Sequence, residues 1–245
     1  MLRKTGVGFL LSLVFVLFAY SSAVAEWYVG GAVGVAMPHD VDDLSASAGG
    51  YTLGISKFSP DNSFAGGVKV GYFSEKTPYL GVEINWSMSA PDVDKETVTA
   101  TIVGTPTGTY AGQTSGDFLF SADVDSVSSF RFLAMLRATD EDAKAKYNGI
   151  QPYLGLGFTV GTLDIDSLTA YDTAGALIGT GTGDSTTDVG FALSAGLNYI
   201  VSDNIKVYSE YGFETVDYEF DSLDGLVTKV NPQASSLMFG ASYSF

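Results

Sequence analysis

The stretch QPYLGLGFTVG at residues 151–161 determines the fold that this sequence predicts. Bulky apolar side chains stand at every second position, with tyrosine, glycine or threonine between them. A period of two is that of a β-strand, whose successive side chains point to opposite faces. One face is large and apolar here and the other is small, which is typical of a strand that crosses a membrane beside a narrow lumen.

The same alternation occurs in seven further segments on both sides of this stretch. They are residues 26–36, 64–73, 78–88, 127–138, 187–200, 204–218 and 235–245. Eight such segments predict an all-β protein, an eight-stranded antiparallel up-and-down transmembrane β-barrel. A closed barrel pairs every backbone hydrogen bond without an edge, which is the condition for β-structure in lipid. Eight strands leave an interior mostly filled by side chains, so an open channel is not expected.

The direction of the alternation separates this prediction from a soluble β-sandwich or lipocalin-like barrel. A soluble barrel buries its bulky apolar set inside, whereas the small or charged set must share the narrow lumen here. The bulky set therefore needs lipid outside. Aromatic residues near the segment ends suit membrane–water interfaces, and those predicted to lie there are Trp27, Tyr72, Trp86 and Tyr199, together with Tyr243.

The first 25 residues have the layout of a secretory signal peptide. Arg3 and Lys4 precede an apolar run at 7–20, which small residues close at 23–25. The alternative is a transmembrane anchor, but a spanning helix needs about 20 apolar residues and this run has about 14. We therefore expect export, cleavage after Ala25, and one mature domain at 26–245. The sequence has no cysteine, so the sheet alone must hold this domain.

The connections between the eight segments alternate between long and short. Long extracellular loops and short periplasmic turns are the rule in such barrels, and an even strand number brings both ends of the domain to the periplasmic side. The loops predicted to lie outside the cell are 37–63, 89–126, 162–186 and 219–234; the predicted turns are 75–77, 140–148 and 202–203.

Charged side chains fall on the inner face of the predicted barrel. They are Lys69, Glu83, Arg131, Arg137, Asp188, Lys206, Glu210 and Glu214. Charges withdrawn from water must pair, so we predict an interior ion-pair network centred on Lys69, Glu83, Arg131 and Glu210, with Lys206 on the same inner face as Glu210. Two interpretations stay open: a gate, or a salt-bridged plug that fixes the strand register.

Three pieces of the sequence resemble the small outer-membrane β-barrel superfamily of opacity porins and OmpA-like transmembrane domains. They are EWYVGGAVG at 26–34, QPYLGLG at 151–157 and GASYSF at 240–245. The resemblance implies integration into outer-membrane lipid, and in some members adhesion, host contact or a narrow pore. The closing Tyr243 and Phe245 resemble the signal read by the barrel-assembly machinery, which the resemblance makes an expected partner.

The net charge of −16, about −18 without the leader, makes nucleic acid an unexpected partner, since binding it relies on Lys and Arg. Acidic residues far outnumber basic ones in the predicted outer loops, where a divalent cation or a host or cell-surface ligand could bind. No EF-hand spacing or phosphate-loop motif is present, so we expect no cofactor and no dedicated metal site. The glycine-containing stretch 179–183 is expected to be flexible.

Enzymes of this membrane class need a positioned nucleophile and base. His39 is the single histidine, and we expect an incidental surface residue. We therefore expect a non-enzymatic barrel with long acidic surface loops, serving envelope integrity, surface interaction or adhesion. The alternatives are a narrow porin for small solutes and, less favoured, an outer-membrane enzyme.

Overall fold

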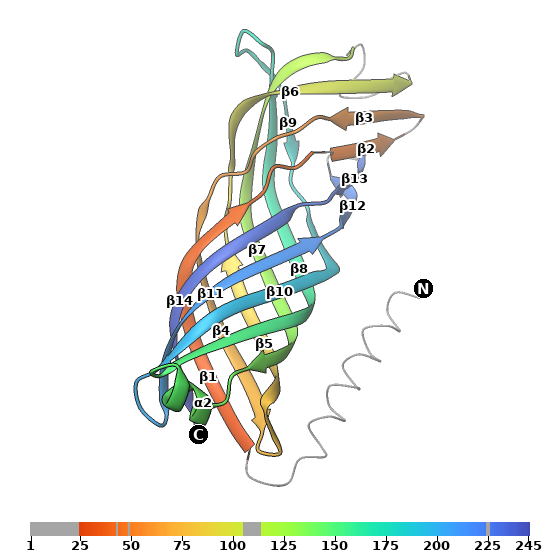
Figure 1. Ribbon diagram of the computed structural model, residues 1–245. Coiled ribbons are helices and arrows are strands. Elements are labelled where there is room, and N and C mark those ends of the chain that lie inside the picture. Colours follow the sequence, from red (N-terminus) through yellow and green to blue (C-terminus); the bar gives the residue numbers. More distant parts are fainter. Residues whose placement is uncertain (1–24, 43, 49, 105–113, 224–225) are drawn as a thin grey trace.

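The structure of the protein, a computed structural model, describes residues 25–245 except 43, 49, 105–113 and 224–225. It is nearly all β-structure, and eight strands form a closed antiparallel barrel (Figure 1). In order around the barrel they are β1 (Ala25–Pro38), β4 (Ser63–Ser74), β5 (Thr77–Ser89), β7 (Gly116–Arg137), β8 (Ile150–Tyr171), β10 (Ser185–Ile200), β11 (Ile205–Val216) and β14 (Gln233–Ser244). The predicted fold class is confirmed. The expected signal peptide at 1–25 lies, but for its last residue, outside the described residues.

The barrel closes between its first and last strands. β1 and β14 pair continuously from Tyr28↔Ser244 to Pro38↔Ala234. Beyond the last pair, the Phe245 amide donates a hydrogen bond of 2.9 Å to the carbonyl of Trp27. This ladder leaves neither of the two strands with an unpaired edge.

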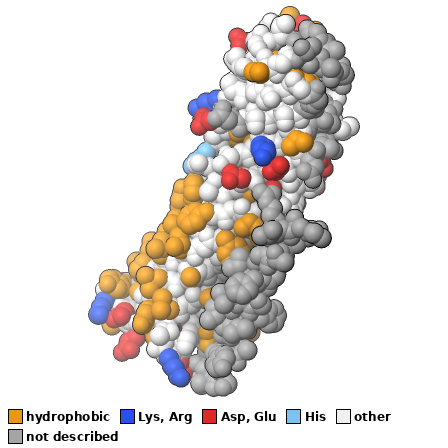
Figure 2. Space-filling model, turned by 90° about the vertical axis from the view of Figure 1, so that its right-hand side faces the viewer, with side chains coloured by type: hydrophobic (Ala, Val, Ile, Leu, Met, Phe, Trp, Pro, Cys, Tyr) orange, Lys and Arg blue, Asp and Glu red, His pale blue; other side chains and the backbone are white. Residues whose placement is uncertain are grey.

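Side chains on the eight strands divide as the alternation predicts. On β1, Val29, Val33 and Val35 are exposed to the outside, whereas Tyr28 is buried inside. Figure 2 shows apolar side chains gathered over the lower part of the barrel, with charged side chains below and above them. An apolar band of this kind is the surface that lipid covers.

The predicted outer loops are not loops but a second region of paired strands, which we call the outer sheet. It contains β2 (Leu44–Ala48), β3 (Tyr51–Ile55), β6 (Val93–Gly104), β9 (Leu177–Thr182), β12 (Tyr218–Leu223), β13 (Leu226–Val230) and the outer halves of β7 and β8. β7 and β8 are 22 residues each and run from the barrel into this region without a break. The predicted boundaries at 127 and 161 were therefore wrong. Residues 179–182 of the stretch expected to be flexible lie in β9, which pairs with β8.

An apolar core lies between the outer sheet and the top of the barrel. It contains Val41, Ile55, Phe58, Val93, Val98, Phe120, Ala122, Leu163, Val216, Tyr218, Phe220 and Val230. The rings of Phe58 and Phe120 lie 5.6 Å apart between centroids. Burial of these side chains gives the outer sheet a core of its own, which explains why it is ordered rather than loop-like.

At the opposite end, which we call the terminal end, the turn between β7 and β8 contains a short helix, α2 (Asp140–Lys146). Thr139 caps it by accepting a hydrogen bond from the Asp142 amide, with acidic residues in the first turn and lysines in the last. Figure 1 places α2 beside the C-terminus and the start of β1. Within the described part of the chain, no helix is long and apolar enough to cross a membrane.

Candidate functional site: the charged lumen and the cavity above it

Lys69 of β4 lies at the centre of the barrel lumen. Its ammonium is 2.9 Å from a Glu210 carboxylate oxygen on β11 and 3.3 Å from a Glu83 oxygen on β5. All three side chains are at most 5% exposed. Arg131 of β7 approaches the second Glu210 oxygen at 3.8 Å. The structure thus brings together all four residues named as the centre of the lumen network.

Tyrosines surround this cluster on the terminal side. The Tyr28 hydroxyl donates to Glu83 at 2.5 Å, and the Tyr153 hydroxyl donates to Glu210 at 2.9 Å. The Lys69 ammonium also lies 3.9 Å from the centroid of the Tyr208 ring, a cation–π geometry. Every central charge therefore has a partner in a space without room for bulk water.

Glycines opposite the tyrosines make this arrangement possible. A Cβ atom at Gly71 would overlap the Tyr28 ring, and a Cβ at Gly196 would overlap the Tyr153 ring. The small residues on the inner faces of β4 and β10 are thus the space into which the tyrosine rings fit. The lumen is filled by side chains at this level.

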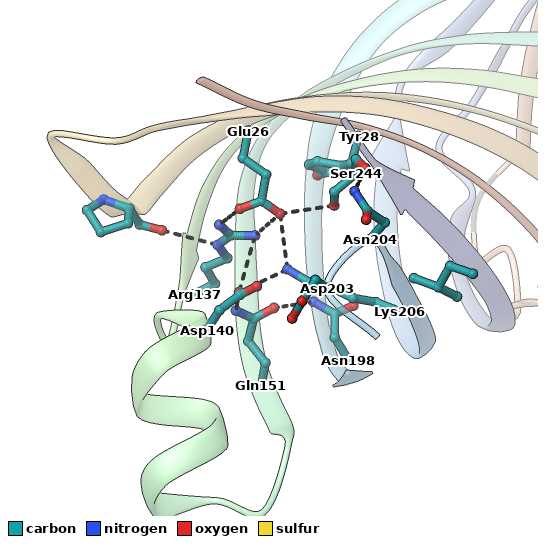
Figure 3. A network of polar contacts seen from close by, with 12 residues as sticks. Glu26, Tyr28, Arg137, Asp140, Gln151, Asn198, Asp203, Asn204, Lys206 and Ser244 are labelled. Carbon is teal, nitrogen blue, oxygen red and sulfur yellow. Dashed lines mark hydrogen bonds and ion pairs between the residues drawn. The ribbon is translucent and has the colours of Figure 1, made fainter. Parts of the chain in front are cut away.

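A second polar cluster closes the terminal end (Figure 3). Arg137 forms an ion pair with Glu26 and lies 4.0 Å from Asp140, while Lys206 is 3.1 Å from Glu26 and 2.9 Å from Asp140. Gln151 donates to Asp140 at 2.6 Å and so fastens the first residue of α2 to β8. The cluster therefore joins β1, α2, β8 and β11 at the rim.

The remaining predicted lumen charges do not join the central cluster in a single network. Lys206 lies on the inner face of β11, as does Glu210, but its ion pairs are with Glu26 and Asp140. Glu214 forms no ion pair among the described residues and instead accepts hydrogen bonds from Ser129 at 2.8 Å and Thr159 at 3.3 Å. Asp188 accepts from the Glu219 amide at 3.0 Å.

Sequence reasoning did not include Glu26 or Asp140 in the lumen set. Glu26 is the first residue of the alternating stretch 26–36 and is in phase with Tyr28, so its inward direction was readable from the period. Asp140 lies beyond the end of its strand, and only the cap signature Thr139 followed by acidic residues marks the helix that positions it.

A cavity of about 140 Å³ lies between the charged cluster and the outer sheet. Apolar side chains of the barrel top and the outer sheet form its walls, including Phe120, Leu163 and Val216. Ser129, Arg131 and Glu214 lie at its lower end. On the other side of the cluster, a much smaller cavity of about 20 Å³ opens among the tyrosines and the rim residues. The central cluster separates the two cavities.

The outer sheet carries many carboxylates and few cations. Its lysines are engaged: Lys57 pairs with Asp40, Lys229 lies 3.3 Å from Glu219, and Lys95 stands 3.2 Å above the Tyr171 ring centroid. The hydrogen bonds from Lys57 and Ser59 hold the pKa of the Asp40 carboxyl below its usual range. Among the described residues, no group of three or more His, Cys, Asp or Glu side chains is arranged to hold a metal ion.

His39 contacts a serine at the outer end of the barrel. Its Nε2 lies 2.9 Å from the Ser235 hydroxyl, which is also 2.7 Å from the Tyr211 hydroxyl. A catalytic Ser–His pair needs a third group to orient the imidazole. Asp40 beside it is bound to Lys57 and Ser59, and no carboxylate among the described residues forms a hydrogen bond with the His39 ring.

The predicted interface aromatics lie on the outer surface. The ring centroids of Trp27 and Tyr72 are 5.0 Å apart near the terminal end. Toward the other end, the ring centroids of Trp86 and Phe130 are 6.5 Å apart. Tyr199 is exposed beside the terminal rim. Tyr243 and Phe245 form an edge-to-face pair at 5.2 Å, and Phe245 is 71% exposed. Their roles at the interface and in assembly stay predictions.

A closed antiparallel barrel with an apolar exterior and a charged interior defines the class of integral outer-membrane barrels. The family model for the outer membrane protein beta-barrel domain matches residues 7–245, and the chain belongs to this family. A comparison with curated protein sequences finds no match.

Among solved structures, the chain is similar to several small outer-membrane barrels. Neisserial surface protein A is 13% identical, with 91% of this chain and 100% of that chain covered and a TM-score of 0.47. The outer membrane protein OprG from Pseudomonas aeruginosa is 14% identical, with 91% and 96% covered and a TM-score of 0.44. The attachment invasion locus protein Ail of Yersinia pestis, in complex with the heparin analogue sucrose octasulfate, is 15% identical, with 89% and 99% covered and a TM-score of 0.40.

Proposed function

We propose that this protein is a non-enzymatic outer-membrane barrel that anchors and displays an acidic outer sheet for contacts at the cell surface. The observation that supports this most directly is the join between the two regions: β7 and β8 continue from the barrel into the outer sheet as single strands of 22 residues. The displayed surface is therefore held in a fixed orientation relative to the membrane.

The charge of the outer sheet supports a partner with a basic surface. Asp42, Asp94 and Asp166 are exposed and form no ion pair among the described residues. A basic partner would find these charges unpaired at the surface, and attraction of this kind weakens as salt is added.

Binding to a basic surface tests the proposal. Full-length protein in lipid nanodiscs is passed over immobilised poly-L-lysine, and a variant with Asp42, Asp94 and Asp166 changed to Asn is compared with it. We expect salt-sensitive retention that the triple variant reduces. A control that removes the same number of terminal-end carboxylates changes Glu75 and Glu141 to Gln and Asp203 to Asn. Equal losses in both variants would overturn a role specific to the outer sheet.

A second candidate is a gated narrow pore. The observation that favours it is that one layer of side chains, centred on Lys69 and Arg131, separates the upper and lower cavities. Single-channel recording in planar bilayers distinguishes the two functions. The plugged anchor predicts no reproducible openings from the wild type; openings whose conductance changes in Glu83→Ala and Arg131→Ala would establish the gate instead.

A further inference from the structure

The cavity above the charged cluster is too large to be an ordinary packing defect. Its volume of about 140 Å³ is close to that of the engineered apolar cavities of about 150 Å³ that bind benzene. Native interiors contain few voids larger than a water molecule. A space of this size within an otherwise packed region fits an occupant about as large as one six-membered ring.

The walls and the lower end of the cavity differ in chemistry. The walls are formed by Phe120, Ala122, Leu163 and Val216, all of which are buried apolar residues. The lower end contains Arg131 and Glu214. An occupant that suits both parts has an apolar body and one polar end.

Arg131 has a hydrogen-bond donor to spare. Its side chain is only 4% exposed, and its Nε is buried with no hydrogen-bond partner among the described residues. The approach of its guanidinium to Glu210 is 3.8 Å, longer than a hydrogen bond. A buried donor without a partner costs free energy, and an oxygen acceptor on an occupant of the cavity would remove that cost.

Glu214 offers the complementary acceptor. It accepts from Ser129 and Thr159, and a carboxylate has about four lone-pair sites. An occupant with a hydroxyl group could therefore accept from Arg131 and donate to Glu214 at the same time.

The charges of the lumen decide against an anionic occupant. Lys69 and Arg131 form ion pairs with Glu83 and Glu210 beneath the cavity, and Glu214, which lines the cavity, forms no ion pair among the described residues. The carboxylates already outnumber the cations. A further negative charge in this low-dielectric space would lack a counter-charge, so the polar end of the occupant is neutral.

We infer that this cavity is a binding site for a small neutral amphiphile: one ring or a short alkyl chain carrying a single hydroxyl group. The ring or chain lies among Phe120, Leu163 and Val216, and the hydroxyl lies between Arg131 and Glu214. This site goes beyond the proposed surface contact and does not depend on it, because its walls are interior side chains rather than the exposed carboxylates.

Three probes of matched shape test the ligand chemistry. Binding of 4-fluorophenol, 4-fluorotoluene and 4-fluorobenzoate to the full-length protein in lipid nanodiscs is measured by fluorine NMR, with empty nanodiscs as the control for partitioning into lipid. We expect saturable binding of 4-fluorophenol, roughly tenfold weaker binding of 4-fluorotoluene because it lacks the hydroxyl, and no binding of the anion. Equal binding of the phenol and the toluene, or tightest binding of the benzoate, would overturn the inferred hydroxyl recognition.

Two kinds of variant test the location. Ala122→Phe and Val216→Phe each fill part of the cavity, and we expect either to abolish saturable binding of 4-fluorophenol. Arg131→Met should lower phenol binding to the level of toluene, whereas Arg137→Met, which removes a buried arginine at the terminal end that does not line this cavity, should leave it unchanged. Heat-modifiable migration on unboiled gels establishes that each variant is folded. Unchanged binding in a folded cavity-filling variant would place the ligand elsewhere and overturn the site.

Discussion

Removal of the Lys69 ammonium gives the sharpest test of how the barrel interior is held together. In Lys69→Met the carboxylates of Glu83 and Glu210 lose the cation that lies 3.3 Å and 2.9 Å from them. Arg131 remains, but at 3.8 Å and only from Glu210. Removing one partner of a buried ion pair costs about 3–5 kcal/mol of stability, because the other charge is left buried without a counter-charge. We therefore expect the free energy of unfolding to fall by about that amount.

The measurement is urea unfolding of the barrel in phospholipid vesicles, followed by tryptophan fluorescence and by heat-modifiable migration. A double variant, Lys69→Met with Glu83→Gln, removes the carboxylate that is left without a cation, while Glu210 keeps Arg131 at 3.8 Å, and it should recover most of the loss. Lys206→Met is the matched control. Lys206 is itself only 3% exposed, but its partners Glu26 and Asp140 retain exposures of 26% and 34% and keep Arg137 as a cation. The loss should therefore be smaller than in Lys69→Met. A loss in Lys69→Met no larger than in Lys206→Met, or no recovery in the double variant, would refute the reasoning.

Three further predictions concern the barrel wall, the terminal rim and the closing residue. Gly71→Ala should destabilise the barrel by about 1–3 kcal/mol because its Cβ meets the Tyr28 ring. Gly31→Ala should have little effect because its Cβ meets nothing closer than 3.9 Å. The same urea assay measures both variants, and equal losses of stability would contradict the packing argument. Arg137→Ala removes the ion pair with Glu26 and the contact with Asp140. The backbone amides of α2 should then exchange hydrogen faster, while those of β10 should not. Unchanged exchange in α2 would show that the rim cluster does not hold the helix. Phe245→Ala should lower the fraction of protein that reaches the heat-modifiable form in the outer-membrane fraction of cells. Phe239→Ala, which removes an exposed aromatic side chain from β14, is the control, and an equal yield from both variants would exclude a special role for the last residue.

The sequence predicts the membrane part of this fold well because the face of each strand residue depends only on the local alternation of side chains. A period of two assigns each residue to one of the two faces of its strand. The face with small or charged side chains is assigned to the lumen, and the face with bulky apolar side chains is assigned to lipid. Lys69 and Glu83 meet as predicted because they lie on adjacent strands at similar height. β4 and β5 pair with Lys69 opposite Asn85 and with Gly71 opposite Glu83.

Contacts across the lumen were harder to predict, since they depend on strand tilt and stagger. Lys206 was placed on the same inner face as Glu210, and it lies there, but its ion pairs are with Glu26 and Asp140 at the rim. Glu26 belongs to β1 and Asp140 to a helix whose position only the closed barrel defines. The period of two gives the face to which each side chain points, but not which side chains from distant strands come into contact.

The outer sheet escaped prediction for a different reason. Three of its strands, β2, β3 and β13, have only five residues each, and several strands pair with partners far away in the sequence, as β13 does with β2. Segments of this length give too few alternations to separate a strand from a loop. Their stability comes from the shared apolar core, which is a property of the assembled fold.

The unbroken run of β7 and β8 from the terminal end to the outer sheet restricts how this surface can change. The β7–β8 ladder already shifts register between Asp123 and Ser126, and a further inserted residue that no such bulge absorbs would turn the side chains beyond it to the opposite face. Core residues such as Phe120 would then be placed in water. Viable variation at this surface is therefore confined to exchange of exposed side chains and to changes of length at the hairpin ends. The surface that a partner or an antibody meets can alter its charge freely while its framework stays constant.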